Sequence, residues 1–220
     1  MSFNILFDVP TSNLQAVVET AQAIEFNRTK LVATTMARSG RVFVAGRNWV
    51  RPWRFTITPA AYYKWADWRQ RFEPLINGDR LETHEINLTN LSWAMAYMGA
   101  GSVNSTTNKL NNVTVQSVNG NQFVFTGTGS TGALFKPGDI FQPEGHTYPY
   151  VVSQYFSLTK TAIVDRGYLQ QASYNPVGQN VVVGKGVTWN VVLTKMPTYR
   201  ILPGQLMEFT GDFEAVEVIE

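Results

Sequence analysis

Hydrophobic and polar residues alternate in the stretch RNWVRPWRFTI, residues 47–57. Alternation indicates a strand with one buried face, because successive side chains of a strand point to opposite sides. Pro52 cannot donate to a ladder, which indicates an edge strand or a bulge. Arg54 falls on the side opposite Arg51 and both tryptophans. The aromatic side is predicted to hold Trp49, Arg51, Trp53, Phe55 and Ile57.

The hydrophobic spacing then becomes helical. Thr58 and Pro59 have the pattern of an N-cap and a first-turn proline, and AAYYKWADWRQRFEPL continues with good helix formers as far as Pro74. We therefore predict a helix at about residues 59–73. Its aromatic stripe is expected to cover a sheet. The stripe consists of Tyr62, Trp65, Trp68 or Arg69, and Phe72.

From Gly99 onward the pattern is that of short strands separated by Gly, Pro and Asn, as in sandwiches and small barrels. KPGD at residues 136–139 and LPGQ at residues 202–205 have Pro and Gly in the order that a tight turn prefers. The expected strands lie in VTVQSV, NQFVFTG, DIFQPEG, YPYVVSQYF, TAIVDRG, QNVVVG, VTWNVVLTKM and LMEFTGDFEAVEVI.

The fold class expected from these patterns is mainly β, with one covering helix. Residues 1–99 and 187–220 would form a sheet-based sandwich or barrel domain, and residues 100–186 an inserted small β-barrel or sandwich. A tandem split near Gly99 is the alternative. Charged residues make up only 15% of the chain, which suits a β-rich protein with much covered surface.

Charge is distributed unevenly along the chain. Residues 28–80 hold eleven Arg and Lys against three acids, a net of +8, whereas residues 208–220 hold five acids and no base. We expect the basic strand and helix to dock on acidic neighbours and the acidic C-terminus on basic ones. The N-terminus lacks the pattern of a secretory signal, and no apolar run reaches the roughly 20 residues of a membrane span.

The motifs of enzyme chemistry are weak. GTGSTG, residues 127–132, matches a dinucleotide fingerprint as a string, but Pro137 and Gly138 follow too soon for a helix, so we predict a flexible hairpin loop. His84 and His146 lack the spacing of zinc ligands and are expected to be structural. Cysteine is absent and there is no G-x-S-x-G elbow. The sequence therefore predicts no catalytic residue, cofactor or metal.

Three segments, in their order along the chain, resemble proteins near the tip of contractile phage tails. The first is VFVAGRNWVRPWRFTITP with the helix, NGDR and LSWAMAYMG that follow it. The second is LFKPGDIFQPEGHTYPYVVSQ, which is similar to a small inserted β-domain of such proteins. The third is TWNVVLTKMPTYRILPGQLMEFTGDFEAVEVIE, which is similar to their C-terminal ending.

The resemblance implies a structural virion protein, namely a baseplate hub or distal-tail-like protein of a tailed phage. The ripcord type of contractile tails is one form that fits. Such proteins are made in the host cytoplasm and assemble in symmetric copies. They link tail tube, hub and sheath-proximal baseplate parts without catalysis, nucleic-acid binding or a membrane span. The residues expected to make contacts are Arg47, Arg51, Arg54, Arg69, Arg71, Glu214 and Glu217.

The residues leave other functions open. A carbohydrate-binding module could stack sugars on Trp49, Trp53 or Tyr148. A glycoside or peptidoglycan hydrolase would need carboxylate pairs that nothing in the sequence selects. A binder of single-stranded nucleic acid ranks last, because alternation separates Arg54 from the stacking tryptophans.

Overall fold

The computed structural model describes residues 13–28, 32–36, 42–46, 52–78, 82–91, 93–127 and 132–219. They are mainly β, which confirms the expected fold class. Two compact units divide the chain: Met1–Asn27, Arg54–Asn87 and Asn190–Val218 form the first, and Arg28–Trp53, Leu88–Trp189 and Ile219–Glu220 the second. The division into residues 1–99 with 187–220 and an inserted 100–186 stays a prediction about folding units.

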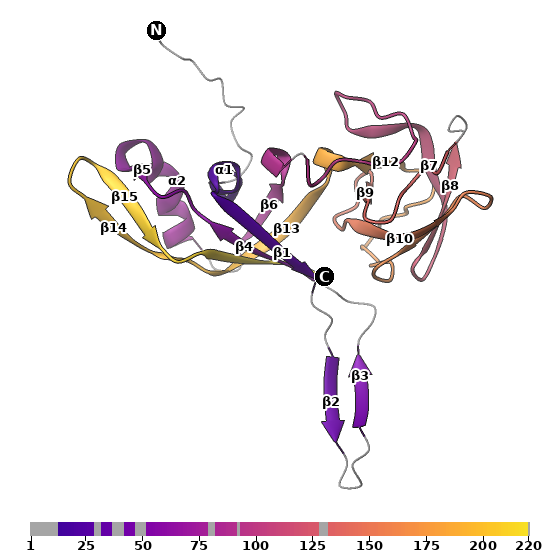
Figure 1. Cartoon of the computed structure of the whole chain (residues 1–220), viewed down its shortest axis with the longest axis horizontal. Coiled ribbons are helices and arrows are strands. Elements are labelled where there is room, and N and C mark those ends of the chain that lie inside the picture. Colours follow the sequence, from indigo (N-terminus) through magenta and orange to yellow (C-terminus); the bar gives the residue numbers. More distant parts are fainter. Residues whose placement is uncertain are drawn as a thin grey trace. The chain divides into compact units, whose positions relative to one another are not determined.

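A five-stranded sheet makes up much of the first unit (Figure 1). The predicted alternation is confirmed in its described half, since Trp53, Phe55 and Ile57 are buried while Arg54 is exposed. The remainder of that stretch, residues 47–51, lies outside the described residues. In sheet order the strands are β1 (Ala23–Arg28), β4 (Trp53–Thr58), β16 (Phe213–Glu217), β13 (Thr188–Lys195) and β6 (Thr83–Asn87).

Helix α1, Asn13–Thr20, was not expected from the sequence. It packs on β6, where Gln15 and Asn87 exchange two hydrogen bonds: the Gln15 amide donates to Asn87 Oδ1 at 2.9 Å, and the Asn87 backbone N–H donates to Gln15 Oε1 at 2.8 Å. The exchange satisfies a polar side chain that is only 2% exposed.

The predicted helix exists, but the expected bounds of about 59–73 are wrong. Helix α2 spans Trp65–Asn77, because the preceding Tyr63–Lys64 form the short strand β5, which pairs with Leu206 and Met207. Ala60 N–H donates to the Tyr63 hydroxyl at 2.9 Å, which holds the chain out of helical geometry there. Pro74 lies inside the helix instead of ending it, and Gly78 N–H caps the end by donating to the Pro74 carbonyl.

A three-stranded sheet of order β14–β15–β5 joins the C-terminal hairpin to α2. Strands β14 (Thr198–Leu202) and β15 (Leu206–Thr210) are antiparallel, and Gly204, with a φ of +85°, supplies the turn predicted at LPGQ. Part of the expected aromatic stripe packs on this sheet, since Phe72 lies 4.8 Å from Phe209, centroid to centroid, whereas Tyr62 precedes the helix and is exposed.

The second unit contains a closed six-stranded barrel of order β10–β11–β8–β7–β12–β9. Its core is aromatic, and Phe123, Phe125 and Phe141 are fully buried. Gly138, with a φ of +97°, makes the predicted KPGD turn. The strands, drawn from magenta to orange in Figure 1, are β7 (Lys109–Asn119), β8 (Gln122–Gly127), β9 (Ile140–Pro143), β10 (Tyr150–Phe156), β11 (Thr161–Val164) and β12 (Asn180–Val183).

Shorter elements complete the described chain. Strands β2 (Val32–Met36) and β3 (Val42–Gly46) pair as an antiparallel ribbon. Two 3-10 turns occupy Thr89–Leu91 and Gly184–Gly186. Most of GTGSTG, residues 128–131, lies outside the described residues, so its predicted loop stays a prediction.

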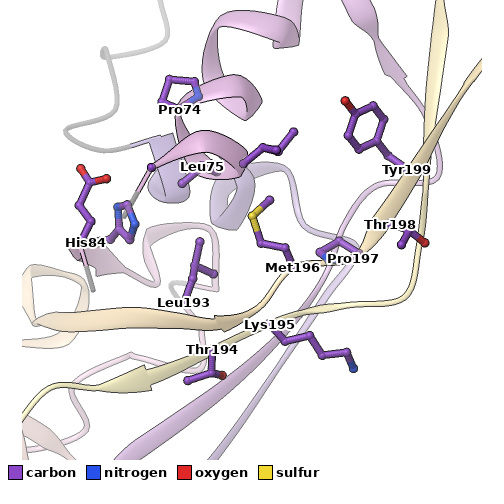
Figure 2. Close-up of a pocket in the computed structure, with 13 residues that line it drawn as sticks. Pro74, Leu75, His84, Leu193, Thr194, Lys195, Met196, Pro197, Thr198 and Tyr199 are labelled. Carbon is purple, nitrogen blue, oxygen red and sulfur yellow. The ribbon is translucent and has the colours of Figure 1, made fainter. Parts of the chain in front are cut away.

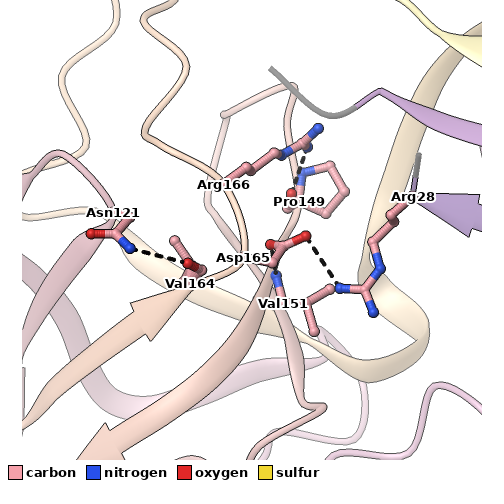
Figure 3. A network of polar contacts seen from close by, with 7 residues as sticks. All are labelled: Arg28, Asn121, Pro149, Val151, Val164, Asp165 and Arg166. Carbon is pink, nitrogen blue, oxygen red and sulfur yellow. Dashed lines mark hydrogen bonds and ion pairs between the residues drawn. The ribbon is translucent and has the colours of Figure 1, made fainter. Parts of the chain in front are cut away.

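A network of polar contacts lies in the second unit (Figure 3). Asp165 accepts a hydrogen bond from Val151 N–H at 3.1 Å and pairs with Arg28 at 3.2 Å. The neighbouring Arg166 is 1% exposed and donates to the Pro149 carbonyl at 2.6 Å. These bonds compensate for removing charged groups from water.

Candidate interaction surface

The charged residues expected to make contacts lie in different settings. Arg47 and Arg51 are outside the described residues, while Arg54 and Arg69 are exposed on β4 and α2. The guanidinium of Arg71 lies over the Trp68 ring at 5.6 Å, a cation–π arrangement on the helix itself.

The two acids expected to make contacts, Glu214 and Glu217, differ in their exposure to solvent. Glu214 pairs with Lys195 at 2.8 Å and stays partly exposed. Glu217 is only 4% exposed, so its carboxylate lies inside the protein and not on a docking surface. The reason is its position on β16, where alternation places it on the same buried side as Phe213 and Ala215.

The acidic and basic segments are neighbours within one sheet. Strand β16 pairs with β4, which places Glu214 opposite Thr56 and Val216 opposite Arg54. A shallow hollow of about 300 Å³ is lined by Arg54 and Glu214 together with Glu25. Some of the basic and acidic residues that are far apart in the sequence therefore lie close together in the sheet, which lowers the net charge that each segment presents to a partner.

The rings named for sugar stacking are covered where the structure describes them. Trp53 is 1% exposed and packs edge-on against Trp189 at 5.4 Å, and Tyr148 is 2% exposed. Trp49 lies outside the described residues. Neither described ring has an open face on which a sugar could stack.

Both histidines are buried, at 7% exposed for His84 and 4% for His146. His146 Nε2 lies 3.1 Å from the Leu169 carbonyl, and Nδ1 lies 3.2 Å from both the carbonyl and the N–H of Tyr148, so both ring nitrogens have backbone partners. Burial lowers the pKa of His146, and Arg166 nearby lowers it further. Burial also lowers the pKa of His84 on β6, against an opposing effect of Glu82.

Strand β14 presents an open surface. It lies at the edge of its sheet, with β15 as its one strand partner among the described residues, and every residue from Thr198 to Ile201 is exposed. Ile201 is 56% exposed, and Tyr62 on the loop before β5 is equally so. An exposed edge with apolar side chains is a template for pairing with another chain.

A pocket of about 600 Å³ adjoins the start of β14 (Figure 2). Its walls come from the end of α2, from β6 and from the connection between β13 and β14. In the view of Figure 2, His84 and Tyr199 lie on opposite sides, with Met196 between them. The apolar lining consists of Leu75, Ile76, Leu193, Met196 and Pro197, beside the polar Glu82, His84 and Lys195.

Aromatic contacts pack β14 against α2 and β15. Tyr199 stacks on Trp65 of α2 at 5.8 Å and lies 6.1 Å from Phe209. On the strand, Arg200 pairs through Nε with Glu208 of β15, and this contact raises the pKa of Arg200. The edge is therefore held in extended form before any partner arrives, which reduces the entropy lost on binding.

Strand β14 was not among the strands predicted from the sequence, although the turn that follows it was. The signal was present in TYRIL: Tyr199 and Ile201 alternate with Thr198 and Arg200, directly before the LPGQ turn. Two β-branched or aromatic residues on one side of a five-residue run indicate a strand.

No three His, Asp or Glu side chains gather closely enough to hold a metal ion within the ranges that the structure describes. In the same ranges, no helix is long and apolar enough to cross a membrane. What the surface around β14 and the adjoining pocket can do chemically is bind an extended or apolar segment of another protein.

No protein-family model matches the chain, and no curated protein matches it in sequence.

Proposed function

We propose that this chain is a structural protein of a phage tail tip or baseplate, which links the tail tube or hub to neighbouring baseplate proteins. Two lines of support come together. The order of three sequence segments resembles proteins of contractile tails, and the first unit exposes an edge strand beside an apolar pocket, as an assembling subunit requires.

The observation that carries the proposal is the open edge of β14. A solitary protein usually protects such an edge with proline, charged side chains, a bulge or a covering loop, because an exposed strand pairs with other chains; within Thr198–Leu202 there is one charge, Arg200, and no proline. Here a side chain of the strand belongs to an aromatic layer, since the Tyr199 ring stacks on Trp65 of α2. A subunit that has a neighbour in a particle needs no such protection once it is assembled.

The proposal assigns the chain no catalytic step and no cofactor. Symmetric copies, made in the host cytoplasm, would present the same edge to the same kind of neighbour at each position in the tail. The closed barrel of the second unit would add a stable body to each copy.

The experiment is to tag the chain in a phage or prophage that encodes it and to purify the tailed particles. Mass spectrometry is expected to find the chain in a fixed ratio to the tube protein, and immunogold labelling to mark one end of the tail. A chain that is absent from washed particles, or that labels heads or the whole tail length, would refute the proposal.

A further inference from the structure

We propose that β14 receives an extended antiparallel strand from a different protein, and that this strand has a carboxylate opposite Arg200. The identification of that protein as a tail-tip neighbour rests on the proposed function, whereas the strand addition itself does not. The inference joins three properties of β14: an outer edge without a strand partner among the described residues, the arrangement of its side chains and the charge of Arg200.

The backbone of β14 supplies the docking groups. In an antiparallel pair, alternate residues direct N–H and C=O toward one neighbour and the rest direct them away. In the five residues Thr198–Leu202, which are paired with β15 on one side, about two or three residues therefore direct both groups outward. An added strand would bond to these groups along about 17 Å of edge.

The side chains select what the strand must look like. Alternation places Tyr199 and Ile201 on one face of the sheet, where the Tyr199 ring stacks on the Trp65 ring. Ile201 is more than half exposed on that face. An incoming strand with apolar residues at the matching positions would extend this layer and remove Ile201 from water.

Charge complementarity determines the residue opposite Arg200. Its guanidinium has five N–H donors, and in the described structure one of them, at Nε, is bonded to Glu208 on the inner side. The two terminal nitrogens suit a second carboxylate on the outer side, in the same cross-strand relation that Glu208 has. The incoming strand is therefore acidic at its centre and apolar beside it.

A second copy of this chain fits less well. Symmetric pairing of β14 with another β14 about Arg200 would place two arginines directly opposite each other, and like charges in that position are destabilising. The favoured occupant is consequently a strand of different sequence.

The test uses a peptide that copies the natural partner of β14. Blocked Leu-Met-Glu-Phe-Thr, the sequence of residues 206–210, carries Glu where an added strand would face Arg200. Titrated into the full chain and followed by amide NMR, it is expected to bind saturably and to shift the signals of Thr198–Leu202. A matched peptide with Lys in place of Glu is expected to bind at least tenfold more weakly.

The protein variant that sharpens this test exchanges the two charges, Arg200→Glu with Glu208→Arg, so that the internal ion pair is kept. The exchanged protein is expected to prefer the Lys peptide over the Glu peptide. Lys185→Glu, a charge reversal at an exposed residue of the barrel unit, is the control and should leave the preference unchanged.

Three results would overturn the inference. They are equal binding of both peptides, shifts that fall outside β14, and self-association of the chain that the Glu peptide reverses, which would make a second copy the occupant. Because no particle is involved, the peptide result stands apart from the tail-tip proposal. A chain absent from particles that still binds the peptide would change only the source of the strand.

Discussion

The barrel and the three-stranded sheet differ in how the edges of their strands are paired. The barrel closes through the pairing of β9 with both β10 and β12, so none of its six strands has a free edge. The sheet β14–β15–β5 ends at β14, whose outer side is unpaired among the described residues. Every strand of the barrel is therefore paired on both sides, whereas the three-stranded sheet has an open outer strand.

The side chains follow the same division. The barrel buries its aromatic rings, with Phe123, Phe125 and Phe141 at its centre. The sheet leaves Tyr62 and Ile201 exposed and adjoins a pocket of about 600 Å³. Stability and contact surface are thus assigned to separate parts of the chain, so changes in one should leave the other intact.

The largest effect is expected from Phe141→Ala in the barrel. Phe141 is fully buried and touches the rings of Phe123 and Phe135. Truncation should lower the free energy of unfolding by about 3–5 kcal/mol, because it removes buried surface and leaves a cavity. Urea unfolding followed by circular dichroism measures this. Leu158→Ala, at a fully exposed position, is the control, and equal losses in both variants would contradict a closed barrel core.

A smaller loss is expected from Asp139→Ala. The carboxylate accepts backbone N–H bonds from Met98 and Lys136, each at 2.8 Å, and so ties the segment before the barrel to the KPGD turn. The variant should lose about 1–3 kcal/mol in total, because Met98 and Lys136 are exposed and water can replace part of what the carboxylate accepts. Hydrogen exchange should quicken at both amides while β14 stays unchanged. Equal acceleration in β14 would mean that the two regions are coupled.

The two histidines, His84 on β6 and His146 in the barrel unit, make stability depend on pH. The pKa of each is below its usual 6.5 in the folded chain, so the unfolded chain binds more protons as pH falls below 6.5. Stability is therefore complete above pH 6.5 and declines below it until the folded pKa is reached. Urea midpoints at pH 7.5 and 5.5 should differ less in His146→Gln and in His84→Gln than in the wild type. An NMR titration that placed either histidine at or above 6.5 would refute this.

The smallest effect on stability is expected from Arg200→Ala. The ion pair with Glu208 is exposed, and exposed pairs contribute little to folding. The urea midpoint should match that of the wild type within error, although peptide binding at β14 should weaken. A loss as large as that of Phe141→Ala would mean that Arg200 serves the fold and not a partner.

Local patterns predicted the strands better than their partners. Alternation in VTVQSV and NQFVFTG correctly indicated β7 and β8, and Pro-Gly pairs marked both turns. The start of α2 was wrong because Tyr63 pairs with β15, a residue far away in sequence. Helix α1 was missed because eight residues give a weak periodic signal. The barrel closure depends on pairing between distant strands, which no local pattern specifies.

The candidate surface could be predicted only in part. The exposure of Arg54 followed from alternation, whereas Glu217 was misplaced because charge was weighed above alternation. The run FEAVE itself places Glu217 with Phe213 and Ala215. The edge position of β14 could not be read from the sequence, since it depends on which strands remain unpaired after the sheets have formed.

Hydrogen exchange of the purified chain tests the contrast between the two regions most directly. Mass spectrometry at neutral pH should find β14 exchanging well before β8 and β12, because its outward amides have no strand partner in the described parts of the chain while the barrel amides open only with the barrel. If the Thr198–Leu202 segment is as slow to exchange as the barrel strands, its edge is already covered within the chain, and the account of β14 as an open docking strand is wrong.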